Sequence, residues 1–138
     1  MRRNPAVIYM TGAFSIMPQP ESKIVRRIRQ EIEKQGGRCF KIHGEDTFQE
    51  VGIPDLLCCY RGRFVGLEVK QPGNKPSPMQ RVVLNEIVAA GGYAAVVTTV
   101  EQVVHLLATI DEEVNHPLSR DSNRRSILDR SLARQGGK

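Results

Sequence analysis

The sequence predicts an α/β fold, a central mixed β-sheet flanked by helices, and three observations support this prediction. Two apolar runs, 54–60 and 63–70, are separated by Arg61 and Gly62 alone, which is typical of a tight β-hairpin. Stretches with apolar residues at helical spacing precede and follow this hairpin. A further strand-like run, 93–99, separates two of these stretches, so helices and strands alternate and are expected to pack in layers.

The elements expected before the hairpin are a helix and a short strand. The helix is predicted over 21–35, because its apolar residues recur on one helix face: Ile24, Val25, Ile28 and Ile32. Gly36 and Gly37 supply its C-terminal stop. Residues 38–44 alternate polar and apolar side chains and predict a strand, which a polar loop follows.

After the hairpin, a turn-rich loop leads to a second helix. Ser77 is its expected N-cap, Pro78 its first residue and Gln80 its third, which is the pattern of a capping box. The strand at 93–99 and a third helix over 100–110 follow. The helices therefore enclose a sheet that contains the hairpin.

The chain of 138 residues is long enough for one domain with one hydrophobic core. We expect three parts: an N-terminal arm or edge strand over 1–20, a core over 21–117 and a basic tail over 118–138. Residues 119–138 hold six Lys and Arg and two Asp, so +4 of the formal charge of +5 lies there. This asymmetry suits a polyanionic partner such as nucleic acid, and equally a solvated basic tail.

Several classes of protein are excluded. No apolar run approaches the roughly 20 residues that span a bilayer, and the first residues lack a signal-peptide pattern, so we expect an intracellular, cytoplasmic protein without membrane contact. The cysteines, Cys39, Cys58 and Cys59, are odd in number, and the last two face opposite sides of one predicted strand. We expect buried reduced thiols, not a disulfide framework or a zinc site.

The hairpin brings two carboxylates together. A two-residue turn sets a register in which Asp55 lies opposite Glu68, with Cβ atoms about 5 Å apart, and Lys70 shares their face. Facing carboxylates repel unless a cation lies between them, and hard oxygen ligands suit magnesium or manganese. Lys70 would then orient the attacking water or stabilise charge on a phosphate. The alternative is a structural ion pair of Lys70 with either carboxylate.

The stretch GIPDLLCCYRGRFVGLEVK resembles the PD-(D/E)XK nuclease signature, with Pro54 and Asp55 as its PD and Glu68, Val69 and Lys70 as its ExK. The GIPD entry, the PSPMQ segment and the AGG before the last strand resemble the VRR-NUC branch of this superfamily. The resemblance implies a restriction endonuclease-like core and a magnesium-dependent phosphodiesterase, with manganese as a substitute and no organic cofactor. It makes Asp55, Glu68 and the Val69 carbonyl metal ligands and Lys70 the catalytic lysine.

Further site residues follow from this resemblance. Family members often add a glutamate from the first helix, which Glu21 matches, with Glu31 as its rival or a surface role for either. Gln80 matches a family glutamine, although the capping box alone would explain it. His43 either approaches a phosphate or is a loop or core residue. Cationic side chains are candidate contacts to the DNA backbone, or simply solvated: Arg61, Arg63, Lys75, Arg124 and Arg125.

Together these features predict a stand-alone VRR-NUC-type endonuclease that cleaves DNA with a metal-activated water. Small nucleases of this fold resemble Holliday junction resolvases, which implies branched DNA as substrate and a homodimer with two active sites. Flap cleavage, nonspecific cleavage and a non-catalytic DNA-binding subunit of a larger viral recombination complex are the alternatives. Resemblance to compact family members suggests a phage origin and location in the host cytoplasm.

Overall fold

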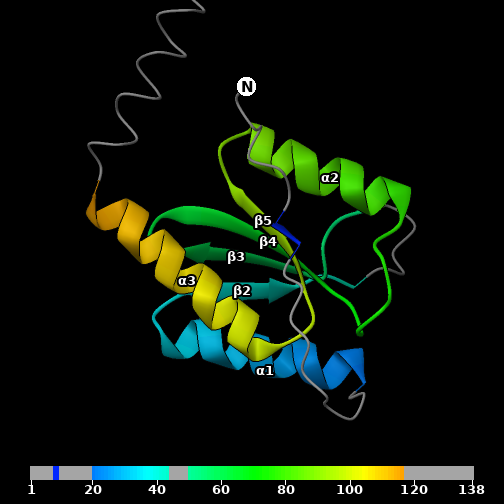
Figure 1. The fold of residues 1–138 in the computed structure, drawn as a ribbon, viewed down its shortest axis with the longest axis horizontal. Helices are drawn as coiled ribbons and strands as arrows, with labels where there is room; N and C mark the ends of the chain where they lie inside the picture. The colour runs from blue at the N-terminus through cyan, green and yellow to red at the C-terminus, as the bar shows by residue number, and fades with distance from the viewer. Residues whose placement is uncertain (1–7, 10–19, 44–49, 117–138) are drawn as a thin grey trace, which may run out of the picture. The chain divides into compact units, whose positions relative to one another are not determined.

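The protein is described from a computed structural model, which defines the structure of residues 8–9, 20–43 and 50–116. Its helices and strands are shown in Figure 1. They are β1 (Ile8–Tyr9), α1 (Glu21–Lys34), β2 (Arg38–Lys41), β3 (Leu56–Tyr60), β4 (Arg63–Val69), α2 (Pro78–Ala89), β5 (Tyr93–Val97) and α3 (Val100–Asn115).

The chain divides into two units, Met1–Leu107 and Ala108–Lys138. The first contains the sheet, α1, α2 and the start of α3, and the second begins within α3. The proposed DNA contacts Arg124 and Arg125 lie outside the described residues, as does most of the predicted arm. The division into arm, core and tail stays a prediction.

The strands form one mixed sheet in the order β1-β5-β4-β3-β2. The strands β1, β5 and β4 are parallel, whereas β3 is antiparallel to both β4 and β2. This arrangement confirms the predicted α/β class. Two details differ from the prediction: β2 ends at Lys41, and α3 runs on to Asn115. The two-residue β1 at the edge of the sheet agrees with the edge strand that is one expectation for residues 1–20.

The turn between β3 and β4 sets the register of the sheet. Arg61 and Gly62 have φ angles of 50° and 71°, and positive φ at both central residues is the mark of a type I′ hairpin turn. Tyr60 pairs with Arg63 and Leu56 with Leu67, as the two-residue turn predicts. Extending this register by one residue places Asp55 opposite Glu68.

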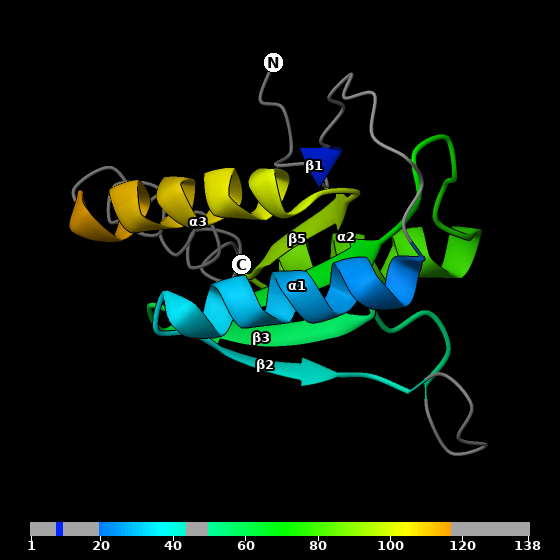
Figure 2. The same ribbon diagram turned by 90° about the horizontal axis from the view of Figure 1, so that it is seen from below.

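Helices cover the two faces of the sheet, with α1 and α2 on opposite sides (Figures 1 and 2). The predicted apolar stripe of α1 is buried, as are the sheet residues that share one face: Leu56, Cys58, Val65, Leu67 and Val69. On the other face, α2 packs against β4 and β5. A Cβ on Gly66 would lie 2.7 Å from Ile87 Cδ1, so a larger residue here would require the Ile87 side chain to shift.

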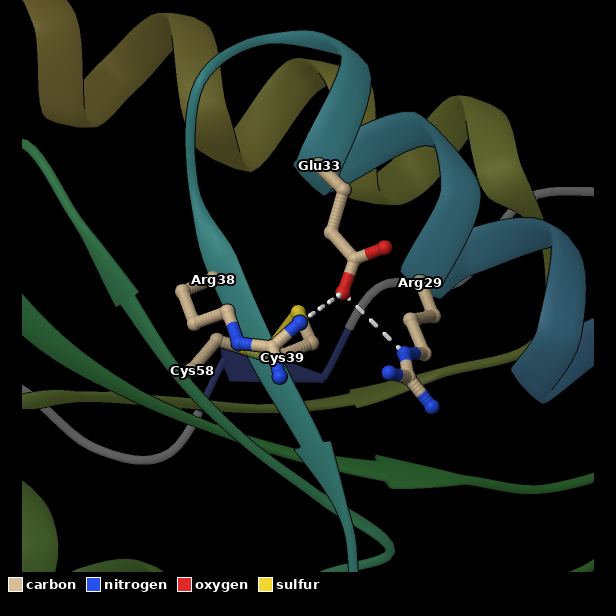
Figure 3. Close-up of a disulfide and its surroundings, with 5 residues drawn as sticks. All are labelled: Arg29, Glu33, Arg38, Cys39 and Cys58. Carbon is tan, nitrogen blue, oxygen red and sulfur yellow. Dashed lines mark hydrogen bonds and ion pairs between the residues drawn. A yellow bond between two sulfur atoms is a disulfide. The ribbon is translucent and has the colours of Figure 1, made fainter.

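The prediction of three buried reduced thiols is correct for the burial of Cys39 and Cys58 and wrong for their reduced state and for the burial of Cys59. Cys39 and Cys58 form a disulfide between β2 and β3, and Cys59 is exposed (Figure 3). The two bonded residues are register partners on the buried face, with Cα atoms 4.2 Å apart. The sequence revealed the opposite orientations of Cys58 and Cys59, but not the strand that lies beside them.

No helix among the described residues has the length and apolarity to cross a bilayer, and a cytoplasmic location stays a prediction.

Candidate active site

The sequence places one carboxylate on each strand of the hairpin, and the fold brings the two together. Asp55 directly precedes β3, and its Oδ2 accepts a hydrogen bond of 2.8 Å from the main-chain N–H of Val69. Its own carbonyl accepts a 2.9 Å bond from the N–H of Ile42, which extends the pairing beyond β2. Asp55 is therefore held from both sides at the end of the sheet.

Glu68 is the only charged side chain in the described residues that is buried, with 1% of its surface exposed. Its Oε1 accepts a 2.9 Å hydrogen bond from Gln80 Nε2 and lies 3.3 Å from Lys70 Nζ. Its Oε2 is buried without a hydrogen-bond partner. An unpartnered carboxylate oxygen is costly in a protein interior, which indicates that this position serves a function.

The pKa of Glu68 is raised from 4.5 to about 7, chiefly because the carboxyl is buried and in addition because the charge of Asp55 is close to it. The ammonium of Lys70 opposes both effects, because it favours the charged form of the carboxylate. One nearby cation is thus not enough to keep the Glu68 pKa in its ordinary range. An additional positive charge next to Glu68 would therefore stabilise its ionised form.

Gln80 combines the two interpretations that its sequence position left open. Its Oε1 accepts a 2.8 Å hydrogen bond from the N–H of Ser77, while Ser77 Oγ accepts one of 3.2 Å from the N–H of Gln80, so the capping box is complete. The same amide points its Nε2 at Glu68. Because one end of the amide is fixed by the helix cap, the other end is fixed as a donor to the carboxylate.

The first helix contributes Glu21 to this end of the sheet. Glu21 Oε1 accepts a 3.4 Å hydrogen bond from the main-chain N–H of Gln71, the residue after Lys70. Glu31 instead accepts a bond of 3.0 Å from Gln35 Nε2, and it lies ten residues, about 15 Å, farther along α1. The geometry therefore favours Glu21 over its rival.

Two solved structures resemble this chain. One, described as a VRR_NUC domain, is 29% identical in sequence and matches with a TM-score of 0.55 over 64% of this chain and 94% of its own. Another, described as a VRR_NUC domain protein, is 16% identical, matches with a TM-score of 0.54 over 72% of this chain and 91% of its own, and supports the fold alone. No family model and no curated protein matches the sequence.

These likenesses support a VRR-NUC domain in this chain. The mixed sheet with flanking helices is the restriction endonuclease-like fold of such domains, and the likeness supports a nuclease domain. Asp55, Glu68 and Lys70 are the residues through which the sequence resembles the PD-(D/E)XK signature.

The fold does not bring all candidate residues to this site. Arg61 and Arg63 lie at the turn of the hairpin, about six residues or 20 Å of strand from Asp55. Lys75 is exposed in the loop between β4 and α2. His43 is exposed one residue beyond the Ile42 that binds the Asp55 carbonyl. The first two candidates can contact DNA only away from the carboxylates.

The residues at this site fit a hard divalent cation. No group of three His, Cys, Asp or Glu side chains gathers among the described residues. The side-chain ligands available at this site are therefore two carboxylates, those of Asp55 and Glu68. The Val69 N–H points to Asp55, and because N–H and C=O of one strand residue leave the strand on the same side, the Val69 carbonyl faces it too. Magnesium commonly binds through one or two carboxylates and keeps several waters.

Sequence reasoning missed the main-chain group of Gln71, which Glu21 binds, and the packing of Pro54. A Cβ on Gly66 would lie 3.3 Å from Pro54 Cγ, so the proline before Asp55 packs on β4 beside the site. Its place in the GIPD entry is the signal that predicted its importance, but not this contact.

Proposed function

We propose that this VRR-NUC domain is a magnesium-dependent DNA endonuclease whose site consists of Asp55, Glu68 and Lys70. The observation that supports it best is the buried Glu68 Oε2, which lacks a hydrogen-bond partner next to a second carboxylate. A structural ion pair with Lys70 would leave this oxygen unsatisfied, whereas a metal ligand requires such an oxygen.

Asp55, Glu68 and the Val69 carbonyl would hold the cation. When bound there, magnesium polarises a phosphate and lowers the pKa of a coordinated water. The Lys70 ammonium, 3.3 Å from Glu68 Oε1, then stabilises negative charge on the phosphate or orients the water. Gln80 keeps the Glu68 carboxylate in place through its 2.9 Å hydrogen bond.

Glu21 has a supporting role in this scheme. Its hydrogen bond to the N–H of Gln71 fixes the chain directly after Lys70, which restrains the direction of the lysine side chain. Manganese, which prefers the same oxygen ligands, is expected to replace magnesium.

The substrate we propose is branched DNA, with a four-way junction as its best example, and the active form is a homodimer. Contacts to the DNA backbone follow the shape and charge of the DNA and not its base sequence, so a nuclease domain can select a branched structure through them. A two-fold symmetric dimer presents two identical sites to two strands. Flap cleavage and nonspecific nicking use the same chemistry, so substrate choice is decided by the cleavage pattern.

The test is cleavage of a labelled four-way junction, a flap and a linear duplex, with magnesium or with EDTA. The variants are Asp55→Ala and, as a matched control, Glu112→Ala, which removes an exposed carboxylate from α3. We expect symmetric cuts in the junction with magnesium, retained in the control and lost in Asp55→Ala. Cleavage of all three DNAs would refute the junction preference, and absence of cleavage with any divalent metal would refute the nuclease.

A further inference from the structure

One part of the sheet surface is apolar, aromatic and exposed. Phe40 on β2 is 56% exposed and Phe64 on β4 is 48% exposed, although both stand within the sheet. Between them on β3 lie the half-buried Leu57 and the exposed Cys59. We call these four residues the ring patch. Exposed aromatic side chains this close together mark an interaction surface on a soluble protein.

The strand register places the ring patch on a single face. Phe40 pairs with Leu57, and Phe64 pairs with Cys59, which is two residues farther along β3. The two rings are thus separated by two strand spacings and two residues, about 12 Å. Helix α2 packs against β4 and β5, and β2 is an edge strand, so this corner of the face is open.

The ring patch and the active site share this face. Phe64 and Glu68 are four residues apart on β4, and side chains at even spacing point to the same side of a strand. The separation along the strand is about 13 Å. A nucleic acid strand whose phosphate lies at Glu68 and Lys70 therefore reaches the rings within a few nucleotides.

The charges around the ring patch favour a polyanion. Two cations lie next to the ring patch, and segments 38–41 and 56–67 contain no carboxylate: Arg38 is two residues from Phe40 on the same face of β2, and Arg61 lies in the turn at this end of the hairpin. The guanidinium of Arg38 stacks 5.0 Å from the centre of the Phe40 ring. It also pairs with Glu33 at 3.3 Å (Figure 3). Arg61 stacks 4.6 Å from the ring of Tyr60. Arg38 and Arg61 are thus each held beside an aromatic ring.

A second copy of the chain fits this surface less well. In a two-fold interface the same patch meets itself, so these cations would face one another at its rim. A single-stranded nucleic acid instead brings phosphates for the cations and flat bases for the rings, and proteins that bind single strands combine these two features.

We propose that the ring patch binds an unpaired DNA strand next to the cleavage site, with bases stacked on Phe40 and Phe64. The inference rests on the proposed nuclease function and specifies its substrate: DNA with unpaired nucleotides near the scissile phosphate. The open centre and arms of a branched structure supply such nucleotides, and a fully paired linear duplex does not.

The experiment measures binding of a fluorescein-labelled twelve-residue oligo-dT by anisotropy in EDTA, so that cleavage does not interfere. The double variant Phe40→Leu/Phe64→Leu keeps apolar side chains but removes both rings. Stacking on one ring changes affinity between about 5- and 100-fold. We therefore expect the dissociation constant of the leucine variant to be at least about tenfold larger than that of the wild type. The double variant Phe40→Tyr/Phe64→Tyr keeps the rings and is expected to bind within about twofold of wild type.

Two controls separate this inference from the nuclease proposal. Val104→Ala alters an exposed apolar residue of α3 and is expected to leave binding unchanged. Asp55→Ala is expected to bind oligo-dT at least as well as wild type, because it removes a negative charge and no ring. Failure of cleavage with intact oligo-dT binding would refute the nuclease alone.

Three results would overturn the inference. The first is no binding of oligo-dT by the wild type, and the second is equal binding by the leucine variant. The third is a change of oligomeric state in the leucine variant, measured by sedimentation velocity, with unchanged oligo-dT binding. That result would make the ring patch a contact between copies of the chain.

Discussion

The two ends of the β3–β4 hairpin differ in almost every physical property although the same two strands build both. At one end, Asp55 and Glu68 bring two carboxylates together, and Glu68 is 1% exposed with an unpartnered oxygen. At the other end, Phe64 is 48% exposed and Arg61 stacks on Tyr60. The first end is acidic and enclosed, and the second is aromatic, cationic and open.

This difference arises from the position of α2. Its N-terminus reaches the first end, where Gln80 binds Glu68, while its body packs on β4 and β5 and leaves Phe40 of β2 and Cys59 of β3 exposed on the same face of the sheet. Enclosing a carboxylate costs free energy and raises its proton affinity, which suits chemistry. Exposed rings and cations suit binding. The account therefore predicts that changes at the two ends affect rate and affinity separately.

The largest effect is expected for Lys70→Met. Loss of the ammonium removes charge stabilisation at the phosphate and should lower the cleavage rate about 10²- to 10³-fold. Stabilisation of the folded protein by magnesium should persist, because the lysine is not a ligand. The matched control Lys34→Met changes an exposed lysine at the far end of α1. Equal rates for the two variants, from single-turnover assays, would remove Lys70 from the site.

A smaller effect concerns Glu68 and pH. Its pKa rises from 4.5 to about 7 in the folded protein, so the protonated form is favoured by folding. In the metal-free wild type, this contribution to the free energy of unfolding should be fully present below about pH 4.5. On the order of 3 kcal/mol of it should be lost as pH rises through about 7. Glu68→Gln cannot ionise and should lack this loss. Denaturant unfolding at several pH values measures the difference.

Magnesium sharpens this test. Bound to the ionised carboxylates, it should restore stability of the wild type above pH 7 by about 2.7 kcal/mol at a concentration of 100 times its dissociation constant. Glu68→Gln should gain less. Parallel stability curves for wild type and variant, with and without magnesium, would contradict the assignment of Glu68.

Gln80 separates the helix cap from the site. Gln80→Ala removes the donor to Glu68 and part of the capping box, and is expected to lower the cleavage rate about 10- to 100-fold. Ser77→Ala removes only the cap, at a cost of about 1 kcal/mol in stability, and should leave the rate within about twofold. Equal rates for the two variants would show that Gln80 serves the cap alone.

The smallest effect is expected at the open end of the hairpin. Arg61→Ala should weaken duplex binding a few-fold and reduce the slope of log affinity against log salt by about 0.9, the value for one phosphate contact. The maximal cleavage rate at saturating DNA should not change, because Arg61 lies about 20 Å from Asp55. An unchanged slope would show that Arg61 is solvated and makes no phosphate contact.

Much of the site could be predicted from the sequence because the hairpin turn has two residues. That length fixes the register, and the register places Asp55 opposite Glu68. Helix periodicity likewise predicted the buried stripe of α1. It could not choose between Glu21 and Glu31, since the phase of a helix does not reveal which end lies at the site.

The remaining features depend on how separate elements pack. The capping box of Gln80 was readable from local sequence, but its contact with Glu68 requires the N-terminus of α2 to lie over β4. The disulfide requires the register between β2 and β3. Exposure of Phe40 contradicts the usual burial of aromatic residues, and it arises because α2 leaves that part of the sheet uncovered.

The central claim is that Asp55 and Glu68 form a metal-dependent nuclease site. The most direct measurement is the single-turnover cleavage rate of a four-way junction by wild type and by Asp55→Asn, which preserves shape and removes charge, across a magnesium titration. The account predicts a rate that rises with magnesium in the wild type and falls at least about 10³-fold in the variant. Equal rates in the two proteins, or no cleavage by folded wild type with magnesium or manganese, would contradict it.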